Sequence, residues 1–151
     1  MSKLFSRLAV RGETLKNRLV GSPMCQYSAE GMDGKPTSWH MVHLGSRAVG
    51  GAGLVMFEAT AVTPEGRISP KDLGLWSDEH IQSFCEVADF ITEQGAVPGI
   101  QLAHAGRKAS HEIPWAGGGV LDVGNGGWQV VAPSCKPYDD GWPMPQELER
   151  H

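Results

Sequence analysis

The sequence lacks several features that would each point to a class of protein. It has no run of Lys or Arg, and its formal net charge of -4 gives no reason to expect nucleic acid or an anionic membrane as a partner. No apolar run approaches the roughly 20 residues of a membrane span. The N-terminus has no long apolar stretch after its charged residues, so a secretory signal is not expected.

Cysteine is also scarce. The three cysteines, Cys25, Cys85 and Cys135, are odd in number and lie far apart in the sequence. This pattern argues against a disulfide framework and favours reduced thiols in the cytoplasm. A phosphate-binding glycine motif is missing too. The glycines of Gly50–Gly53 precede a strand candidate, whereas a dinucleotide motif follows a strand and opens a helix, so we interpret them as the end of a helix.

The sequence does contain an alternation of strand and helix patterns with short connections. Such an alternation predicts parallel strands joined by right-handed crossovers, and therefore the α/β class. The predicted elements are a β-hairpin within residues 4–16, strands at residues 18–21, 54–59 and 96–103, a helix capped at Thr37 or Ser38 that runs to Val49, and a helix capped by Ser77 that Gly95 closes.

Each predicted helix carries apolar residues at helical spacing, which should face the sheet. In the first helix these residues form two adjacent rows, Met41, Leu44 and Ala48 beside Val42, Gly45 and Val49. In the second helix they are Ile81, Phe84, Cys85, Ala88 and Ile91.

After Ala109 the alternation ends. Residues 110–146 are rich in Gly and Pro and predict a long excursion loop, with one short strand at residues 128–131. Loops of this length are usually functional or disordered. Because disordered segments are poor in aromatic residues, Trp115, Trp128 and Trp142 favour an ordered, functional loop.

The candidate site residues begin with Cys25 and Tyr27, directly after the first core strand. In an α/β barrel this is where chemistry is placed. The residues alone leave several roles open for Cys25: a buried core thiol, a nucleophile, a metal ligand or a group that contacts a cofactor. A zinc site with His40 and His43 would lack the paired Cys spacing typical of such sites.

Three further candidates follow the third predicted strand or lie in it. Gln101 and Ala103 should share one face of that strand because side chains alternate. An amide there needs partners that both donate and accept, which a flat heterocycle with C=O and N–H groups would provide. His104 and Arg107 lie at the carboxyl end of the strand, in the expected active-site layer.

Several longer motifs occur in order along the chain. They are Leu15–Leu19, Ser22–Tyr27, Phe57–Val62, Pro64–Ile68, Leu75–His80, Gly99–Ala109, Ala132–Ser134 and Pro145–Leu148. Together they resemble the Old Yellow Enzyme family of FMN-dependent ene-reductases, and most closely its bacterial xenobiotic-reductase and thermophilic-like branch.

This resemblance implies a fold and a cofactor. The fold would be the N-terminal part of a (β/α)8 TIM barrel, with about three βα units preceded by a β-hairpin lid. Residues 1–151 would form one incomplete FMN-binding domain, and residues 110–146 its long loop. FMN would lie at the carboxyl ends of the strands, with NADPH or NADH as the reductant and no metal.

The resemblance also implies roles for particular residues. The residues expected to line or contact the flavin are Ser22, Pro23, Met24, Cys25, Ala59 and Gln101. Cys25 would lie near the flavin N5/O4 region and tune its redox potential, and Gln101 would bind the pyrimidine end. Tyr27 would offer its hydroxyl to the substrate.

The implied activity is reduction of the activated C=C bond of enones and enals by an NAD(P)H oxidoreductase. Relatives of full length are expected to be homo-oligomers. The chain is expected to stop before the segments that supply the proton donor and hold the FMN phosphate. A second hypothesis is therefore a catalytically inactive fragment that does not bind FMN tightly.

Overall fold

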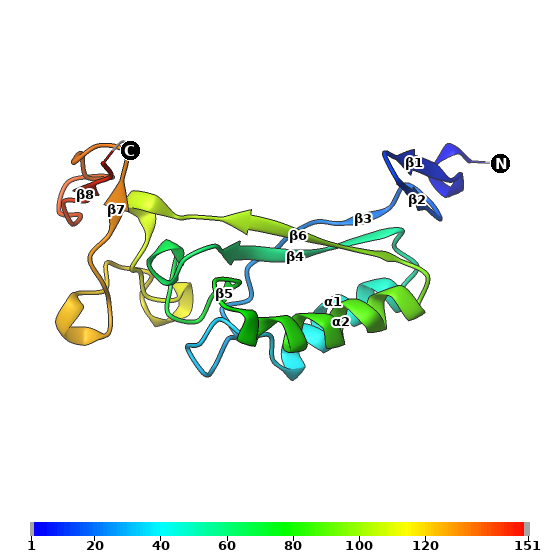
Figure 1. The fold of residues 1–151 in the computed structure, drawn as a ribbon, viewed down its shortest axis with the longest axis horizontal. Coiled ribbons are helices and arrows are strands. Elements are labelled where there is room, and N and C mark those ends of the chain that lie inside the picture. The colour runs from blue at the N-terminus through cyan, green and yellow to red at the C-terminus, as the bar shows by residue number, and fades with distance from the viewer. Residues whose placement is uncertain (1, 150–151) are drawn as a thin grey trace.

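The computed structural model of this protein describes residues 2–149 (Figure 1). The strands are β1 (Leu8–Val10), β2 (Glu13–Leu15), β3 (Val20–Gly21), β4 (Leu54–Ala61), β5 (Leu73–Gly74), β6 (Val97–Ala103), β7 (Val131–Ala132) and β8 (Gln146–Glu147). The α-helices are α1 (Ser38–Val49) and α2 (Ile81–Glu93). The short 3-10 helices are η1 (Lys3–Phe5), η2 (Pro64–Gly66), η3 (Asp78–His80), η4 (Gly106–Lys108), η5 (Pro114–Ala116) and η6 (Val123–Asn125).

The central sheet is built around β4. Strand β6 runs parallel along the whole of β4, from the Leu54–Val97 pair to the Ala61–Ala103 pair. The other edge of β4 is shared by β3 at its start and β5 at its end, both also parallel to it. The predicted α/β class with parallel strands is therefore confirmed. The described residues form an open sheet and not a closed barrel.

Both α-helices cover the same face of this sheet, and α1 lies beside α2 beneath β4 and β6 in Figure 1. The core between them is apolar. Its most buried members are Ala29, Leu44, Ala48, Val55, Phe57, Leu73, Val87, Ile91 and Ala96, together with Phe84. The rings of Phe57 on β4 and Phe84 on α2 lie 5.3 Å apart, which fixes the helix against the strand.

The predicted apolar rows of the helices are only partly correct. On α1, Leu44 and Ala48 are buried, but Val42 and Val49 are 58% and 65% exposed. On α2, Val87 is buried and was missed, whereas Ile81 and Cys85 are exposed. The reason on α2 is that Cys85 and Ala88 face an open groove of about 260 Å³ beside β6, and no other element of residues 2–149 covers that groove.

The N-terminal hairpin of β1 and β2 lies where the strands of the central sheet begin, at the opposite end from β7 and β8 (Figure 1). Two side chains after the hairpin fix this position. The Lys16 ammonium donates to the Gln94 carbonyl at 2.9 Å, and the Asn17 amide donates to the Gly51 carbonyl at 2.7 Å. The hairpin therefore lies far from the carboxyl ends of the strands.

The segment of residues 110–146 contains more short elements than the one strand that was predicted for it. It contains η5, η6 and β7, and β7 pairs with β8. The short strand lies at Val131–Ala132, slightly later than predicted. Buried Ser110 holds the loop together, since its hydroxyl donates to the Leu121 carbonyl and accepts from the Trp128 amide. No helix in residues 2–149 is long and apolar enough to cross a bilayer.

Candidate functional site

Three predicted site residues come together near the carboxyl ends of the strands. Cys25 follows β3, Ala59 lies in β4, and Gln101 lies directly beside Ala59 in β6. Ile100, which precedes Gln101, packs against the core on the helix side. Because strand side chains alternate, Gln101 points to the face of the sheet that the helices leave open.

A β-bulge at Glu58 sets this arrangement. Phe57 pairs with Ile100 and Ala59 pairs with Gln101, so Glu58 has no partner in β6. The extra residue turns the Glu58 side chain toward α1, on the same side as Phe57. Its Oε1 accepts a hydrogen bond from the backbone amide of Gln26 at 2.9 Å. Its Oε2 lies 3.6 Å from Nε2 of buried His40. Glu58 therefore ties the segment that carries Cys25 to both β4 and α1.

The Cys25 thiol is partly buried beside this bulge. Burial is the largest of the causes that raise the pKa of this thiol to about 11. The negative charges of Asp72 and Glu58 raise the pKa further, whereas a hydrogen bond with the Ala59 backbone lowers it. The side chain therefore stays a neutral thiol at physiological pH. This environment is the reverse of the electropositive surroundings that activate nucleophilic cysteines.

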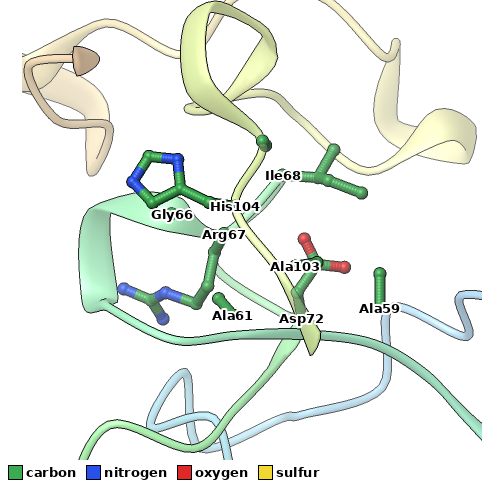
Figure 2. A pocket seen from close by; sticks show the side chains of 9 residues that line it. Ala59, Ala61, Gly66, Arg67, Ile68, Asp72, Ala103 and His104 are labelled. Atoms are coloured by element: carbon green, nitrogen blue, oxygen red, sulfur yellow. The ribbon is translucent and has the colours of Figure 1, made fainter. Parts of the chain in front are cut away.

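Asp72 is the most unusual acid in this region. It is 1% exposed and lines a cavity of about 80 Å³ at the carboxyl ends of β4 and β6. In Figure 2 its carboxylate lies between Ala59 and Ala103. The Ser69 amide donates to Oδ2, but Oδ1 has no hydrogen-bond partner in residues 2–149. Desolvation raises the Asp72 pKa to about 6.

Tyr27 has strained backbone geometry. Its φ is 51°, a left-handed value that is uncommon for residues other than Gly. Its ring meets Trp115 of η5 edge-on, with centroids 5.7 Å apart and an interplanar angle of 80°. Burial raises the pKa of Tyr27, so its hydroxyl stays protonated. The long loop thus brings an exposed tryptophan to the edge of the site.

The open face offers a surface for a flat ring system. Gln101 is exposed, and its amide makes no hydrogen bond within residues 2–149. Its neighbours Ala59, Ala61 and Ala103 carry only methyl side chains. A free amide, small side chains and a neutral thiol fit a heterocycle with paired donors and acceptors, as the FMN ring system has.

Two of the remaining residues that are predicted to line the flavin border another groove. Ser22 and Met24 line a separate groove of about 370 Å³ with Leu19 and Arg47, at the outer edge of β3. Pro23 lies between them and is half-buried. The structure therefore brings Cys25, Ala59 and Gln101 together but leaves the side chains of Ser22 and Met24 outside this group.

The two polar residues predicted after β6 have local partners. Nδ1 of His104 accepts the Gly106 amide at 3.0 Å, and its ring lines the Asp72 cavity. The Arg107 guanidinium donates to the Ser134 hydroxyl at 3.0 Å and so ties β6 to the long loop. His40 accepts the Thr37 amide at the start of α1. Within residues 2–149 no group of three or more His, Cys, Asp and Glu side chains is placed to hold a metal ion.

Sequence reasoning missed Glu58, Asp72 and Trp115. An acid inside the apolar run of residues 54–61 was a signal for Glu58, because a buried charge needs partners. The aromatic content of the long loop was a general signal for Trp115. Asp72 lies in a turn-rich segment where acids are common, so its burial depends on tertiary packing alone.

The model of the NADH:flavin oxidoreductase / NADH oxidase family matches residues 3–127. The NADPH dehydrogenase of Geobacillus thermodenitrificans (strain NG80-2) is 46% identical over 147 residues, and the match covers 97% of this chain. The chain spans 39% of the length of that relative.

Solved structures agree with this match. A morphinone reductase in complex with tetrahydroNAD superposes with a TM-score of 0.76 at 27% identity, over 99% of this chain and 41% of that one. The Old Yellow Enzyme homologue from Zymomonas mobilis gives a TM-score of 0.77 at 26% identity, over 98% of this chain and 40% of that one. The chain therefore belongs to the NADH:flavin oxidoreductase / NADH oxidase family, which includes the Old Yellow Enzyme homologues.

Proposed function

We propose that this chain is part of an FMN-dependent NAD(P)H oxidoreductase of the ene-reductase type. Its substrates are activated alkenes, namely enones and enals. The observation that carries the proposal is the convergence of Cys25, Ala59 and Gln101 on an open sheet face, in a chain whose family is flavin-dependent. The sheet is then part of a (β/α)8 barrel, and the open face is its interior.

When bound, FMN supplies the hydride chemistry of the reaction. The residues of this chain bind the FMN ring system, orient it and tune its redox potential. The exposed Gln101 amide both donates and accepts, so it holds the polar edge of a heterocycle in one orientation. The backbone of Ala59 contacts the same ring system. The Cys25 thiol, kept neutral, is a weak hydrogen-bond donor that changes the relative stability of the oxidised and reduced cofactor.

Tyr27 and Trp115 form one side of the substrate pocket. The Tyr27 hydroxyl stays protonated and can donate to a substrate carbonyl oxygen. The Trp115 ring packs edge-on against it and offers an apolar surface to a cyclic substrate. Backbone strain at Tyr27 supports a functional role, since such outliers cluster at ligand sites.

On this proposal the protein has a small-molecule substrate, works in the cytoplasm with its three free cysteines reduced, and forms a homo-oligomer at full length. One observation favours the alternative of an inactive fragment that does not bind FMN tightly. The edge of β6 is open, and Leu102 on it is 60% exposed, beside the apolar groove near α2.

Binding of FMN to the purified chain tests the proposal. We expect Gln101→Ala to weaken FMN binding about tenfold, the value of one buried hydrogen bond of about 1.4 kcal/mol. The matched control is Gln82→Ala, on the exposed face of α2, where no change is expected. Dissociation constants come from quenching of flavin fluorescence.

The same samples distinguish the two hypotheses. Anaerobic addition of NADPH should bleach the bound flavin, and 2-cyclohexenone should restore its colour. Equal affinities of the wild type and Gln101→Ala would contradict the role of Gln101 in FMN binding. The absence of any binding at millimolar FMN would support the inactive fragment instead.

A further inference from the structure

Tyr27 has a backbone conformation that other residues must hold in place. Its φ of 51° lies in the left-handed region, which is disfavoured for an L-residue by a factor of roughly five to thirty. Such a conformation persists only where the surrounding contacts determine it. The backbone amide and carbonyl of Tyr27 make no hydrogen bond within residues 2–149, so these contacts come from its neighbours.

The hydroxyl of Ser28 spans Tyr27. It donates a hydrogen bond to the Gln26 carbonyl at 2.9 Å and so joins the residues on either side of Tyr27. Serine hydroxyls bond to nearby backbone groups in this way and compete with regular backbone conformations. The Gln26 carbonyl belongs to the peptide group whose rotation relative to Tyr27 is measured by φ. The hydrogen bond therefore restrains the rotation that gives Tyr27 its left-handed value.

The residue before Tyr27 is anchored to two elements. The backbone amide of Gln26 donates to Glu58 of β4 at 2.9 Å. The side-chain amide of Gln26 donates to the Met24 carbonyl at 2.8 Å, and its oxygen accepts a hydrogen bond from the Trp39 indole of α1 at 3.0 Å. Every polar group of Gln26 that could let the segment rotate is thus already bonded.

The residues after Tyr27 are anchored as well. The carbonyl of Ser28 accepts a hydrogen bond from the Thr37 hydroxyl at 3.1 Å. The backbone amide of Ala29 donates to the Lys71 carbonyl at 3.0 Å, and Ala29 is fully buried in the core. With both sides fixed, the hydroxyl of Ser28 is the contact that bridges Tyr27 itself.

We propose that Ser28 is a positioning residue that acts through Tyr27: its hydroxyl holds Tyr27 in the left-handed conformation that brings the tyrosine ring edge-on against Trp115. The inference deepens the proposed function and rests on it for the role of the Tyr27 hydroxyl as a donor to the substrate. A donor that is fixed before binding avoids the cost of ordering a side chain when the substrate arrives. Ser28 would then prepare one wall of the substrate pocket.

The position of the Tyr27 ring can be followed by NMR without any flavin. The chain has only two tyrosines, Tyr27 and Tyr138, so labelling the tyrosine rings with ¹³C gives two sets of signals. Trp115→Leu removes the ring that meets Tyr27 and should shift the Tyr27 signals, while the Tyr138 signals stay unchanged as an internal reference. An unchanged Tyr27 spectrum in Trp115→Leu would overturn the proposal.

Ser28→Ala removes only the bridging hydroxyl. We expect the ratio of left-handed to other conformations of Tyr27 to fall about fivefold, the usual effect of one hydrogen bond. The Tyr27 signals should move and respond less to Trp115→Leu. Ser28→Thr keeps the hydroxyl and should restore the wild-type spectrum. The matched control is Ser46→Ala on α1, whose hydroxyl donates to the His43 carbonyl at 3.0 Å and which should leave the Tyr27 signals unchanged.

Ser28→Ala should fold, because Ser28 is not part of the apolar core. Circular dichroism and the Tyr138 signals check this. Tyr27 signals that stay as in the wild type in folded Ser28→Ala would overturn the proposal. The same conclusion would follow if Ser28→Thr behaved like Ser28→Ala.

A second test needs no change at Ser28. Glycine adopts a left-handed φ without steric cost, whereas alanine does not, so Tyr27→Gly should unfold with an equilibrium constant about two- to fivefold smaller than that of Tyr27→Ala. At an ordinary negative φ the order is reversed, because glycine loses more backbone entropy on folding. A more stable Tyr27→Ala would therefore contradict the left-handed conformation that the proposal requires.

The outcomes also separate this inference from the proposed function. A chain in which Ser28 positions Tyr27 but which binds no FMN would contradict the proposed function alone. A chain that binds FMN, but whose Tyr27 signals are the same in the wild type and Ser28→Ala, would contradict the inference about Ser28 alone.

Discussion

Replacing Glu58 with alanine is expected to lower the free energy of unfolding by about 2–3 kcal/mol, the usual cost of losing a buried hydrogen bond to a charged group. The Glu58 side chain is almost fully buried, with its two oxygens turned to the Gln26 amide and to His40. Without it, the backbone amide of Gln26 would have no partner, and Nε2 of His40 would lose the carboxylate oxygen that lies 3.6 Å away. The bulge would also lose the side chain that holds the Cys25 segment against β4.

Urea unfolding followed by circular dichroism measures this loss. Glu58→Gln keeps an oxygen for the Gln26 amide, so it should lose only about 1–2 kcal/mol. Glu86→Ala, on the exposed face of α2, is the matched control and should stay within about 0.5 kcal/mol of the wild type. If Glu58→Ala were as stable as Glu86→Ala, Glu58 would not be the link between the strand and the helix.

Replacing Arg67 with alanine should release the long loop. The guanidinium lies between the rings of Trp76 and Trp128, 5.1 Å from each centroid. The guanidinium also donates hydrogen bonds to the carbonyl of Met32 at 2.8 Å and to the carbonyl of Pro64 at 2.9 Å. Two cation–π contacts and charged hydrogen bonds of this kind contribute about 2–3 kcal/mol together, given that the group is only half-buried.

The expected result is local opening rather than global unfolding, because the core between β4, β6 and the helices does not include Arg67. Limited proteolysis should cleave within residues 110–146 roughly two- to fivefold faster, because the Trp128 contact that joins Arg67 to this segment contributes about 0.5–1 kcal/mol. Arg67→Lys should recover only part of the protection, because an ammonium cannot reproduce the planar stacking. Arg7→Ala, exposed near the hairpin, is the control. Unchanged cleavage in Arg67→Ala would show that other contacts hold the loop.

The sequence predicted the strands and helices well because their signals are local. The apolar run from Leu54 and the helix caps at Thr37 and Ser77 depend only on neighbouring residues. The faces of the helices were harder to predict. Whether Val42 or Cys85 is buried depends on which neighbouring element packs there, and spacing carries no such information.

The site residues likewise divide into those that could be predicted from the sequence and those that depend on tertiary packing. Cys25, Ala59 and Gln101 were predicted by a family resemblance, and the register of β4 with β6 places the last two side by side. The bulge at Glu58 and the burial of Asp72 could not be predicted, because both depend on contacts between segments far apart in the sequence. Burial is the main cause that raises the pKa of the Cys25 thiol, and both acids add to it, so part of the chemistry of the site appears only in three dimensions.

The central claim is that Cys25, Ala59 and Gln101 form one cofactor-binding surface. Titration of the ¹⁵N-labelled chain with FMN, followed by NMR, tests it most directly because chemical shifts detect even weak binding. The account predicts progressive shifts of the backbone amides of Cys25, Ala59 and Gln101 and of the Gln101 side-chain amide, with none at the β1–β2 hairpin. Shifts confined to the groove of Ser22 and Met24, or no shifts at millimolar FMN, would contradict it.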